Sequence, residues 1–257
     1  MSMQNDVAPD LDLVGPESRF PTVTLTRPAP SGYLLLALEI DRRPIGGHFL
    51  ESGRKKEALA ILKRSAGDLT GSDGVTGATA FKAMMEPPGR GPFLKKRPKV
   101  PVARFDALLL VEFERPAAAR AFKTGDTWRG IEAATGALAR RAFTLSATNV
   151  RRIAPVDHSR DGVFLFNFFY ADRLDVNLAI WEHVAGWYQD QTGLDNSTLL
   201  LPDPGQDCPY TVVNHCRWDR LRDLMRPMLL DLGFHSYVSD NFARNKTAPM
   251  PMLYRLA

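Results

Sequence analysis

Three long apolar runs constrain the fold of this chain more than any other feature. They lie at Tyr33–Ile40 (YLLLALEI), Phe105–Glu114 (FDALLLVEFE) and Val163–Tyr170 (VFLFNFFY). A strand with one face in water alternates apolar and polar residues, and these runs lack clean alternation. We therefore expect strands whose two faces are both buried, in a sheet covered by helices on one side and by more protein on the other.

The elements expected around these runs occur in the same order twice. Helices are predicted where apolar residues recur every three or four positions, as they do at Leu59, Leu62, Ala66 and Leu69. Elements of the first half are expected at residues 33–40, 51–69, 75–84, 105–114, 116–134 and 143–153. Those of the second half are expected at residues 163–170, 174–192, 197–201, 210–218 and 221–232, with the last strand inside 236–254. Each half therefore has the order strand, helix, strand, strand, helix, strand, which is that of a ferredoxin-like unit.

This repeated order predicts an α+β protein made of two fused ferredoxin-like β-α-β-β-α-β units. Packing the two sheets together buries the second face of each and forms one α/β barrel of the dimeric type within a single chain. Residues 1–30 are rich in proline and are expected to form an irregular N-terminal arm. The first half then spans residues 31–155, with a Pro/Gly-rich loop insertion at 86–101, and the second half spans residues 160–257.

Bulk composition argues against several classes of protein. The formal net charge is +4, and the one basic cluster, Lys95-Lys96-Arg97 with Lys99, lies in the Pro/Gly-rich loop. A nucleic-acid binder concentrates its basic residues on one surface, so no nucleic-acid partner is expected. The two cysteines give neither a disulfide framework nor a zinc site, and no apolar stretch is long enough to span a bilayer. We expect a reduced, cytoplasmic protein with no membrane partner and no metal.

The segment YTVVNHCRWD at residues 210–219 places polar side chains in a strand that should be buried. Alternate residues of a strand share a face. One face would carry Tyr210, Val212, Asn214, Cys216 and Trp218. The other face would carry His215 and Arg217 toward the first half of the chain. A buried arginine needs an acid, and Glu112 or Glu39 could supply it.

This part of the chain resembles the antibiotic-biosynthesis-monooxygenase group of dimeric α/β-barrel proteins. The resemblance is carried by NLAIWEHVAGWYQDQTGLDNSTLL followed by YTVVNHCRWD, and it covers most of the second half. That family has an asparagine in its first strand, a glycine at the end of the first helix, and Asn-x-x-x-Trp before an acid in its third strand. The matching positions here are Asn167, Gly193, Asn214, Trp218 and Asp219. Over the first half, the resemblance rests on element order and on FDALLLVEFE.

The resemblance carries implications for assembly and cofactors. In most members two chains each supply half of the barrel, so here one chain would supply both halves. Two such barrels could also associate as a homodimer. Some members are oxygenases that act on aromatic or quinol substrates without metal or flavin, and others degrade haem. The haem-degrading members use a histidine on the helix after the tryptophan. The segment RLRDLMRPMLLDL has none, so no cofactor is expected.

The resemblance also places a pocket between the sheet and the helices. The amides of Asn214 and Asn167 would hold or polarise a substrate oxygen and Trp218 would stack on a flat ring, so these three are the candidate catalytic residues. The residues expected to complete the substrate-binding surface are Cys216, Tyr210 and Trp181. The alternative is that both amides satisfy neighbouring backbone groups and that the tryptophan belongs to the core.

Comparison of the two halves assigns the pocket to the second half, because Leu109 aligns with Asn214 and Leu36 aligns with Asn167. The function expected is a cofactor-independent monooxygenase type of enzyme acting on a small aromatic or apolar carbonyl compound. The alternatives are a non-enzymatic small-molecule-binding or stress-related protein with the same pocket, and a structural module with no cavity. A cavity of roughly 300 Å³ or more would exclude the module. A titratable base at that cavity would favour the enzyme.

Overall fold

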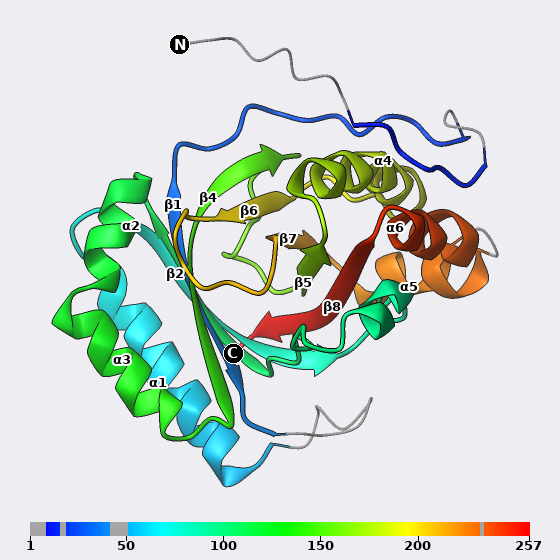
Figure 1. The fold of residues 1–257 in the computed structure, drawn as a ribbon. Coiled ribbons are helices and arrows are strands. Elements are labelled where there is room, and N and C mark those ends of the chain that lie inside the picture. Colours follow the sequence, from blue (N-terminus) through cyan, green and yellow to red (C-terminus); the bar gives the residue numbers. More distant parts are fainter. Residues whose placement is uncertain (1–8, 16–18, 42–50, 232–233) are drawn as a thin grey trace, which may run out of the picture.

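Antiparallel strands close into a barrel in the computed structural model, which describes residues 9–15, 19–41, 51–231 and 234–257 (Figure 1). The order around the ring is β1-β3-β2-β8-β5-β7-β6-β4, and β4 pairs with β1 to complete it. The strands are β1 (Gly32–Glu39), β2 (Val75–Met85), β3 (Ala107–Phe113), β4 (Arg141–Arg152), β5 (Val163–Ala171), β6 (Thr198–Pro202), β7 (Val212–Trp218) and β8 (Thr247–Leu256). The helices are α1 (Gly53–Leu69), η3 (Pro92–Lys96), α2 (Pro116–Lys123), α3 (Asp126–Gly136), α4 (Leu174–Thr192), α5 (Leu221–Leu230), the π-helical η4 (Phe234–Ser239) and α6 (Asp240–Arg244).

The strand order is the same in the two halves of the chain. Around the ring the first half contributes β4-β1-β3-β2 and the second contributes β8-β5-β7-β6, so both halves present their strands in the order fourth, first, third, second. The halves meet at two antiparallel seams, where β2 pairs with β8 and β4 pairs with β6. Closing the ring pairs the edges that each four-stranded sheet would otherwise expose.

The hydrophobic core has three layers. Inside the barrel, buried aromatic rings fill the space, among them Phe81, Phe105, Phe166 and Tyr254. Outside it, α1, α2 and α3 cover the strands of the first half, and α4, α5 and α6 cover those of the second half on the opposite side of the barrel (Figure 1). The three apolar runs are therefore buried on both faces, which confirms the prediction made from their lack of alternation.

Two expected elements differ from those observed. The helix expected at 116–134 is divided into α2 and α3 at Thr124 and Gly125, where the backbone of the glycine is extended. The segment 236–254 holds helical residues before its strand, because Tyr237, Val238 and Phe242 recur at helical spacing and bury their side chains under α4. Lys246 then adopts a positive φ of 50°, which turns the chain from α6 into β8.

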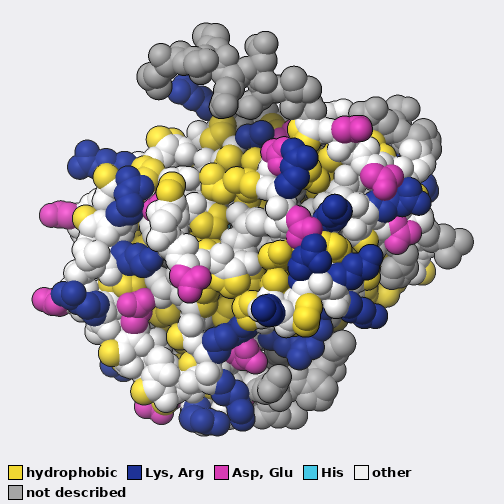
Figure 2. Space-filling model, in the orientation of Figure 1, with side chains coloured by type: hydrophobic (Ala, Val, Ile, Leu, Met, Phe, Trp, Pro, Cys, Tyr) yellow, Lys and Arg dark blue, Asp and Glu magenta, His cyan; other side chains and the backbone are white. Residues whose placement is uncertain are grey.

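The basic cluster expected in the Pro/Gly-rich loop lies on and just after η3. Lys95 and Lys96 are exposed on η3, while Arg97 forms an ion pair of 2.5 Å with Asp172. Figure 2 shows acidic side chains and hydrophobic side chains among the basic ones on this face of the molecule. Among the described residues, no helix combines the length and apolar character needed to cross a bilayer.

The N-terminal arm lies across the helices of the second half (Figure 1). The Val14 N–H donates to Asn241 Oδ1 at 2.7 Å, and the Thr24 N–H donates to Gln189 Oε1 at 3.0 Å. At Gly186, in the middle of α4, an added Cβ would lie 2.0 Å from the carbonyl oxygen of Pro21. A glycine at this position is what lets the arm approach the helix so closely.

The Gly186→Ala variant is therefore expected to lose about 1–3 kcal/mol in its free energy of unfolding, because the arm must move off α4. The matched control is Gly130→Ala in α3, where an added Cβ meets nothing within 4 Å. That substitution should instead stabilise the protein by about 0.5–1 kcal/mol, since alanine is the better helix former. Urea unfolding of both variants measures the two effects, and equal shifts would contradict the contact between arm and helix.

Candidate functional site

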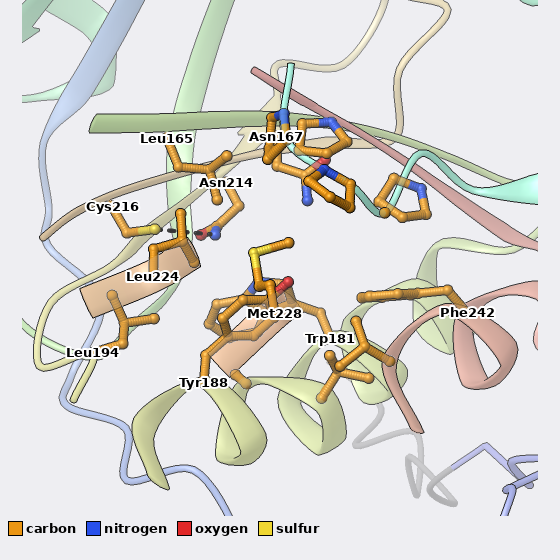
Figure 3. A pocket seen from close by; sticks show the side chains of 18 of the residues that line it. Leu165, Asn167, Trp181, Tyr188, Leu194, Asn214, Cys216, Leu224, Met228 and Phe242 are labelled. Carbon is orange, nitrogen blue, oxygen red and sulfur yellow. Dashed lines mark hydrogen bonds between the residues drawn. The ribbon is translucent and has the colours of Figure 1, made fainter. Parts of the chain in front are cut away.

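A cavity lies between the second group of strands and the helices that cover them (Figure 3). Its floor is the outer face of β5 and β7, and α4, α5, η4 and α6 supply its other walls. The loop segment Pro87–Gly89 and the prolines of β8 complete the lining. The first half of the chain thus adds one loop to a cavity built mainly by the second.

Most of the residues expected to form a site line this cavity. They are Asn167 on β5, Trp181 on α4, and Asn214, Cys216 and Trp218 on β7. The last three share one face of β7 because they alternate along the strand. The side chains predicted from the sequence are therefore brought together, although their roles remain a matter for proposal.

Tyr210 does not line the cavity, and the expectation that it shares a face with Asn214 is wrong. The chain bends at Thr211, and β7 begins only at Val212, so strand alternation does not extend back to the tyrosine. Its ring lies inside the barrel, 5.1 Å from that of Phe168, and its hydroxyl donates to the Pro101 carbonyl at 3.2 Å. Tyr210 is a residue of the barrel core.

Two of the candidate catalytic residues use polar atoms in hydrogen bonds within the protein. Asn214 Oδ1 accepts a hydrogen bond of 2.6 Å from the Ser197 hydroxyl, while its Nδ2 lies 3.8 Å from Cys216 Sγ. Trp218 Nε1 donates to the Thr192 hydroxyl at 2.9 Å. A ligand could therefore meet the amide N–H of Asn214 and the ring of Trp218, but neither the amide oxygen nor the indole N–H.

Two other polar groups at the cavity are free to contact a ligand. Asn167 Oδ1 accepts the Met250 N–H at 2.9 Å, but its Nδ2 makes no hydrogen bond to the described part of the chain. The Tyr188 hydroxyl on α4 also has no hydrogen-bond partner among the described residues. Sequence analysis gave Tyr188 no role. Its position two turns beyond Trp181 on the same face of the helix was the available signal.

The cavity wall is electrically neutral. Tyr188 and Cys216 are the titratable groups among its described lining residues. Burial raises the pKa of the Tyr188 hydroxyl well above its ordinary value, and the nearby Cys216 adds to that rise. Burial also raises the pKa of the Cys216 thiol, against a smaller lowering by the Asn214 amide. Both groups are protonated at neutral pH, so neither can serve as a general base.

The cavity is also narrow. Its free volume is ≈ 40 Å³, room for about three water molecules. This volume is well below the roughly 300 Å³ that would exclude a structural module with no cavity. Leu224 and Met228 of α5 and Phe242 of α6 occupy the side opposite the amides (Figure 3). An organic ligand could bind only if these side chains moved.

The resemblance to haem-degrading proteins finds no support in the donor set at this cavity. Its described lining residues include no histidine, and α5, which follows Trp218, contains none. The ≈ 40 Å³ of free volume is also far too small for a porphyrin. Haem does not fit this cavity.

The opposite face of β7 points into the barrel and holds a different set of contacts. His215 Nε2 lies 2.7 Å from His158 Nε2, and that histidine lies 3.2 Å from Glu112, so His215 does meet the first half. Arg217, however, pairs with Asp219 at 2.7 Å rather than with Glu112 or Glu39. The acid comes from its own strand end because the side chain turns toward the rim of the barrel, where it also donates to the Asp161 carbonyl.

The two halves carry different residues at matching positions, as their alignment predicted. Leu36 of β1 pairs directly with Leu109 of β3, and both are fully buried under the first group of helices. Asn167 of β5 pairs in the same way with Asn214 of β7. The first half thus fills with leucine the place where the second half has two amides and a cavity.

No protein-family model and no curated protein matches the sequence. Solved structures match its fold. One is an anthrone oxidase-like protein with a TM-score of 0.57 and 10% identity, covering 88% of this chain and 91% of that one. Another is a proposed monooxygenase from Fusobacterium nucleatum subsp. nucleatum, with a TM-score of 0.55 and 9% identity, covering 89% of this chain and 94% of that one. At these identities the similarity concerns the fold.

Fold and site together define a class of protein. The chain is an α+β barrel with helices packed on two sides and a neutral, apolar pocket between the barrel and one group of helices. It shares this barrel with proteins named for oxygenase or oxidase activity.

Proposed function

We propose that the chain binds a small, uncharged, flat molecule, aromatic or otherwise apolar, that carries a carbonyl or hydroxyl oxygen. The observation that carries this proposal is the composition of the cavity wall, which is apolar and neutral except for a few uncharged polar groups. Two of those groups, Asn167 Nδ2 and the Tyr188 hydroxyl, have no partner in the described chain. A charged ligand would lose its hydration here and find no opposite charge.

The arrangement of the wall suits such a ligand. Trp181 and Trp218 offer aromatic surface, and the unpaired donors can each point a proton at a ligand oxygen. A ligand oxygen that accepts from these unpaired donors gains hydrogen bonds that a hydrocarbon of the same shape cannot make, so the oxygen-bearing ligand is selected. The proposed site residues are therefore Asn167, Tyr188, Asn214, Trp181 and Trp218, with Cys216 as an apolar contact.

We also infer that the chain is a tandem copy of one ferredoxin-like unit, of which only the second kept a pocket. The repeated strand order and the matching pairs Leu36–Leu109 and Asn167–Asn214 support this origin.

A second candidate is oxygenase chemistry on the same kind of ligand. It is favoured by the names of the two proteins that share the fold, a proposed monooxygenase and an anthrone oxidase-like protein. Such a reaction would convert a methylene between aromatic rings into a carbonyl, with one atom of O₂ entering the product and the other leaving in water. Because the described wall has no base, the substrate would have to lose its proton without one.

The Tyr188→Phe variant tests the binding proposal, because it removes one hydroxyl and leaves the ring. Binding of naphthoquinone, followed by calorimetry, should weaken by about 1 kcal/mol, or roughly fivefold, through the lost hydrogen bond. Binding of naphthalene, which has no oxygen, should be unchanged. The control is Tyr170→Phe, whose hydroxyl contacts Asp172 at the surface.

Two outcomes would count against the proposal. If the native chain binds neither naphthoquinone nor naphthalene, the cavity is a packing defect of the core and not a binding site. If Tyr188→Phe and Tyr170→Phe behave alike, the hydroxyl is not a ligand contact. Oxygen uptake with anthrone, which has a methylene between two aromatic rings, tests the second candidate when the native chain is compared with Asn214→Ala. Equal rates would exclude chemistry at this site.

A further inference from the structure

A second cavity opens inside the barrel, on the other face of β7 from the apolar pocket. Its free volume is ≈ 140 Å³, more than that of the apolar pocket, and its wall is mostly polar. The titratable groups that face it come from five different parts of the chain. They are Tyr33 of β1, Glu112 of β3, Arg152 of β4, His158 of the segment between the halves, and His215 of β7.

The hydrogen bonds of the two histidines determine where their protons lie. His215 Nδ1 is 3.1 Å from the Leu165 carbonyl oxygen, which can only accept, so this nitrogen carries a proton. Burial lowers the pKa of His215, and the nearby His158 lowers it further, so the ring is neutral and its Nε2 is a bare acceptor. The Nε2 of His158, 2.7 Å away, must therefore donate.

The other nitrogen of His158 completes the argument. Its Nδ1 lies 3.2 Å from Glu112 Oε1. A bare nitrogen there would set its lone pair against a carboxylate, whereas a protonated one forms an ion pair. His158 is thus an imidazolium, held between a carboxylate and a neutral imidazole.

Arg152 adds a positive charge that nothing in the described chain balances. Its Nε is buried without a hydrogen-bond partner, and its guanidinium forms no ion pair with a described acid. Burial raises the pKa of Tyr33 to about 12, so this residue is neutral. The wall therefore has two positive charges, on Arg152 and His158, against one negative charge on Glu112.

We propose that this chamber is a binding site for a small singly charged anion of the carboxylate type. The Arg152 guanidinium would bind the carboxylate, because its fork of N–H donors matches two carboxylate oxygens. Hydroxyls of Ser31, Tyr33 and Thr198 line the same chamber and can donate to the anion. Glu112 limits the site to a single negative charge, since a dianion would be repelled. The site is separate from the apolar pocket, and the proposal does not depend on the function proposed there.

Sodium acetate is the probe, with sodium chloride at equal ionic strength as the reference. Acetate is expected to shift the imidazole NMR signals of His158 and His215 in a saturable way, and chloride is not. The Arg152→Met variant should weaken acetate binding by roughly tenfold or more, because a charge-assisted pair of hydrogen bonds is lost. The matched control is Arg151→Met on the next residue, whose side chain pairs with Glu182 instead of facing the chamber.

A His158 variant gives a second readout. Replacing His158 by glutamine removes the imidazolium that lies between Glu112 and His215 and so removes one positive charge from the wall. His158→Gln should therefore bind acetate more weakly than the native chain at the same pH. If Arg152→Met does not fold, as judged by circular dichroism, Arg152→Gln replaces it with the same expected loss.

Three results would overturn the proposal. They are the absence of a saturable acetate effect beyond that of chloride, equal binding by the Arg152 and Arg151 variants, and acetate binding by His158→Gln that matches the native chain. Binding of naphthoquinone to the apolar pocket should be the same in all these variants. Failure of the anion-site proposal can therefore be distinguished from failure of the function proposed for the apolar pocket.

Discussion

The Asp106→Asn variant is expected to become more stable relative to the native chain as the pH rises from 4 to 7. Asp106 is fully buried, and burial raises its pKa from 3.8 to about 6, against smaller lowering by the Asp41 and Ile40 N–H groups. The folded state therefore binds this proton more tightly than the unfolded state does. The stability it contributes is present below pH 4 and is lost as the pH rises through 6. This difference in pKa corresponds to about 3 kcal/mol.

The geometry explains why a buried carboxyl is kept at this place. Asp106 Oδ1 accepts the Ile40 N–H at 2.9 Å, and Oδ2 accepts the Asp41 N–H at 2.7 Å, so the side chain satisfies the backbone where β1 ends. Asparagine keeps one of these acceptors and never carries the charge. Urea unfolding of both proteins at several pH values gives the difference in free energy at each.

The control for this experiment is Asp157→Asn, in the segment between the halves. Hydrogen bonds from Ser159 and Arg160 lower the pKa of Asp157, so its contribution to stability is lost as the pH falls. That loss occurs below the ordinary carboxyl pKa of 3.8, so the difference between Asp157→Asn and the native chain should be nearly constant from pH 4 to 7. It should also be small, because the side chain is exposed. A difference for Asp106→Asn that stays constant from pH 4 to 7 would show that the carboxyl does not titrate in this range.

The Met228→Ala variant is expected to bind naphthoquinone more tightly than the native chain while being less stable. Met228 is buried and fills the side of the apolar pocket opposite the amides (Figure 3). Its truncation should cost about 2–5 kcal/mol in the free energy of unfolding. It also leaves an apolar space next to the unpaired polar groups, and such spaces stay empty of water and bind flat rings. The ligand then no longer has to displace the side chain.

Met250→Ala is the matched control for this prediction. Met250 is equally buried, but its side chain lies inside the barrel, where the Ala103 N–H donates to its sulfur at 3.4 Å. A similar loss of stability is expected, with no gain in affinity. Calorimetric titration and thermal unfolding of both variants give the two quantities. If both variants, or neither, bound the ligand more tightly, the pocket beside Asn167 would not be where it binds.

The candidate site shows how far a strand pattern can be followed from the sequence. Alternation along β7 correctly placed Asn214, Cys216 and Trp218 on one face, because an extended backbone leaves no other choice. It failed at Tyr210, since the chain bends at Thr211 and the period is reset there. A bend of this kind depends on what the segment packs against, here the aromatic core of the barrel.

The distribution of polar atoms was beyond the reach of the sequence. The Ser197 hydroxyl donates to the amide oxygen of Asn214, and the indole N–H of Trp218 donates to Thr192. Both hydrogen bonds join segments that are far apart in the chain. The same holds for the pair of His158 and His215, which joins the segment between the halves to β7.

The order of elements, the burial of both faces of the strands and the difference between the two halves were determined by the sequence alone. These properties follow from local periodicity and from which positions are apolar, and both can be read along a chain. The width of the apolar pocket, the break between α2 and α3, the helical residues before β8 and the charge balance of the barrel chamber were decided by the tertiary structure. Each depends on distances between side chains from different strands and helices, which the folded chain sets to a fraction of an ångström.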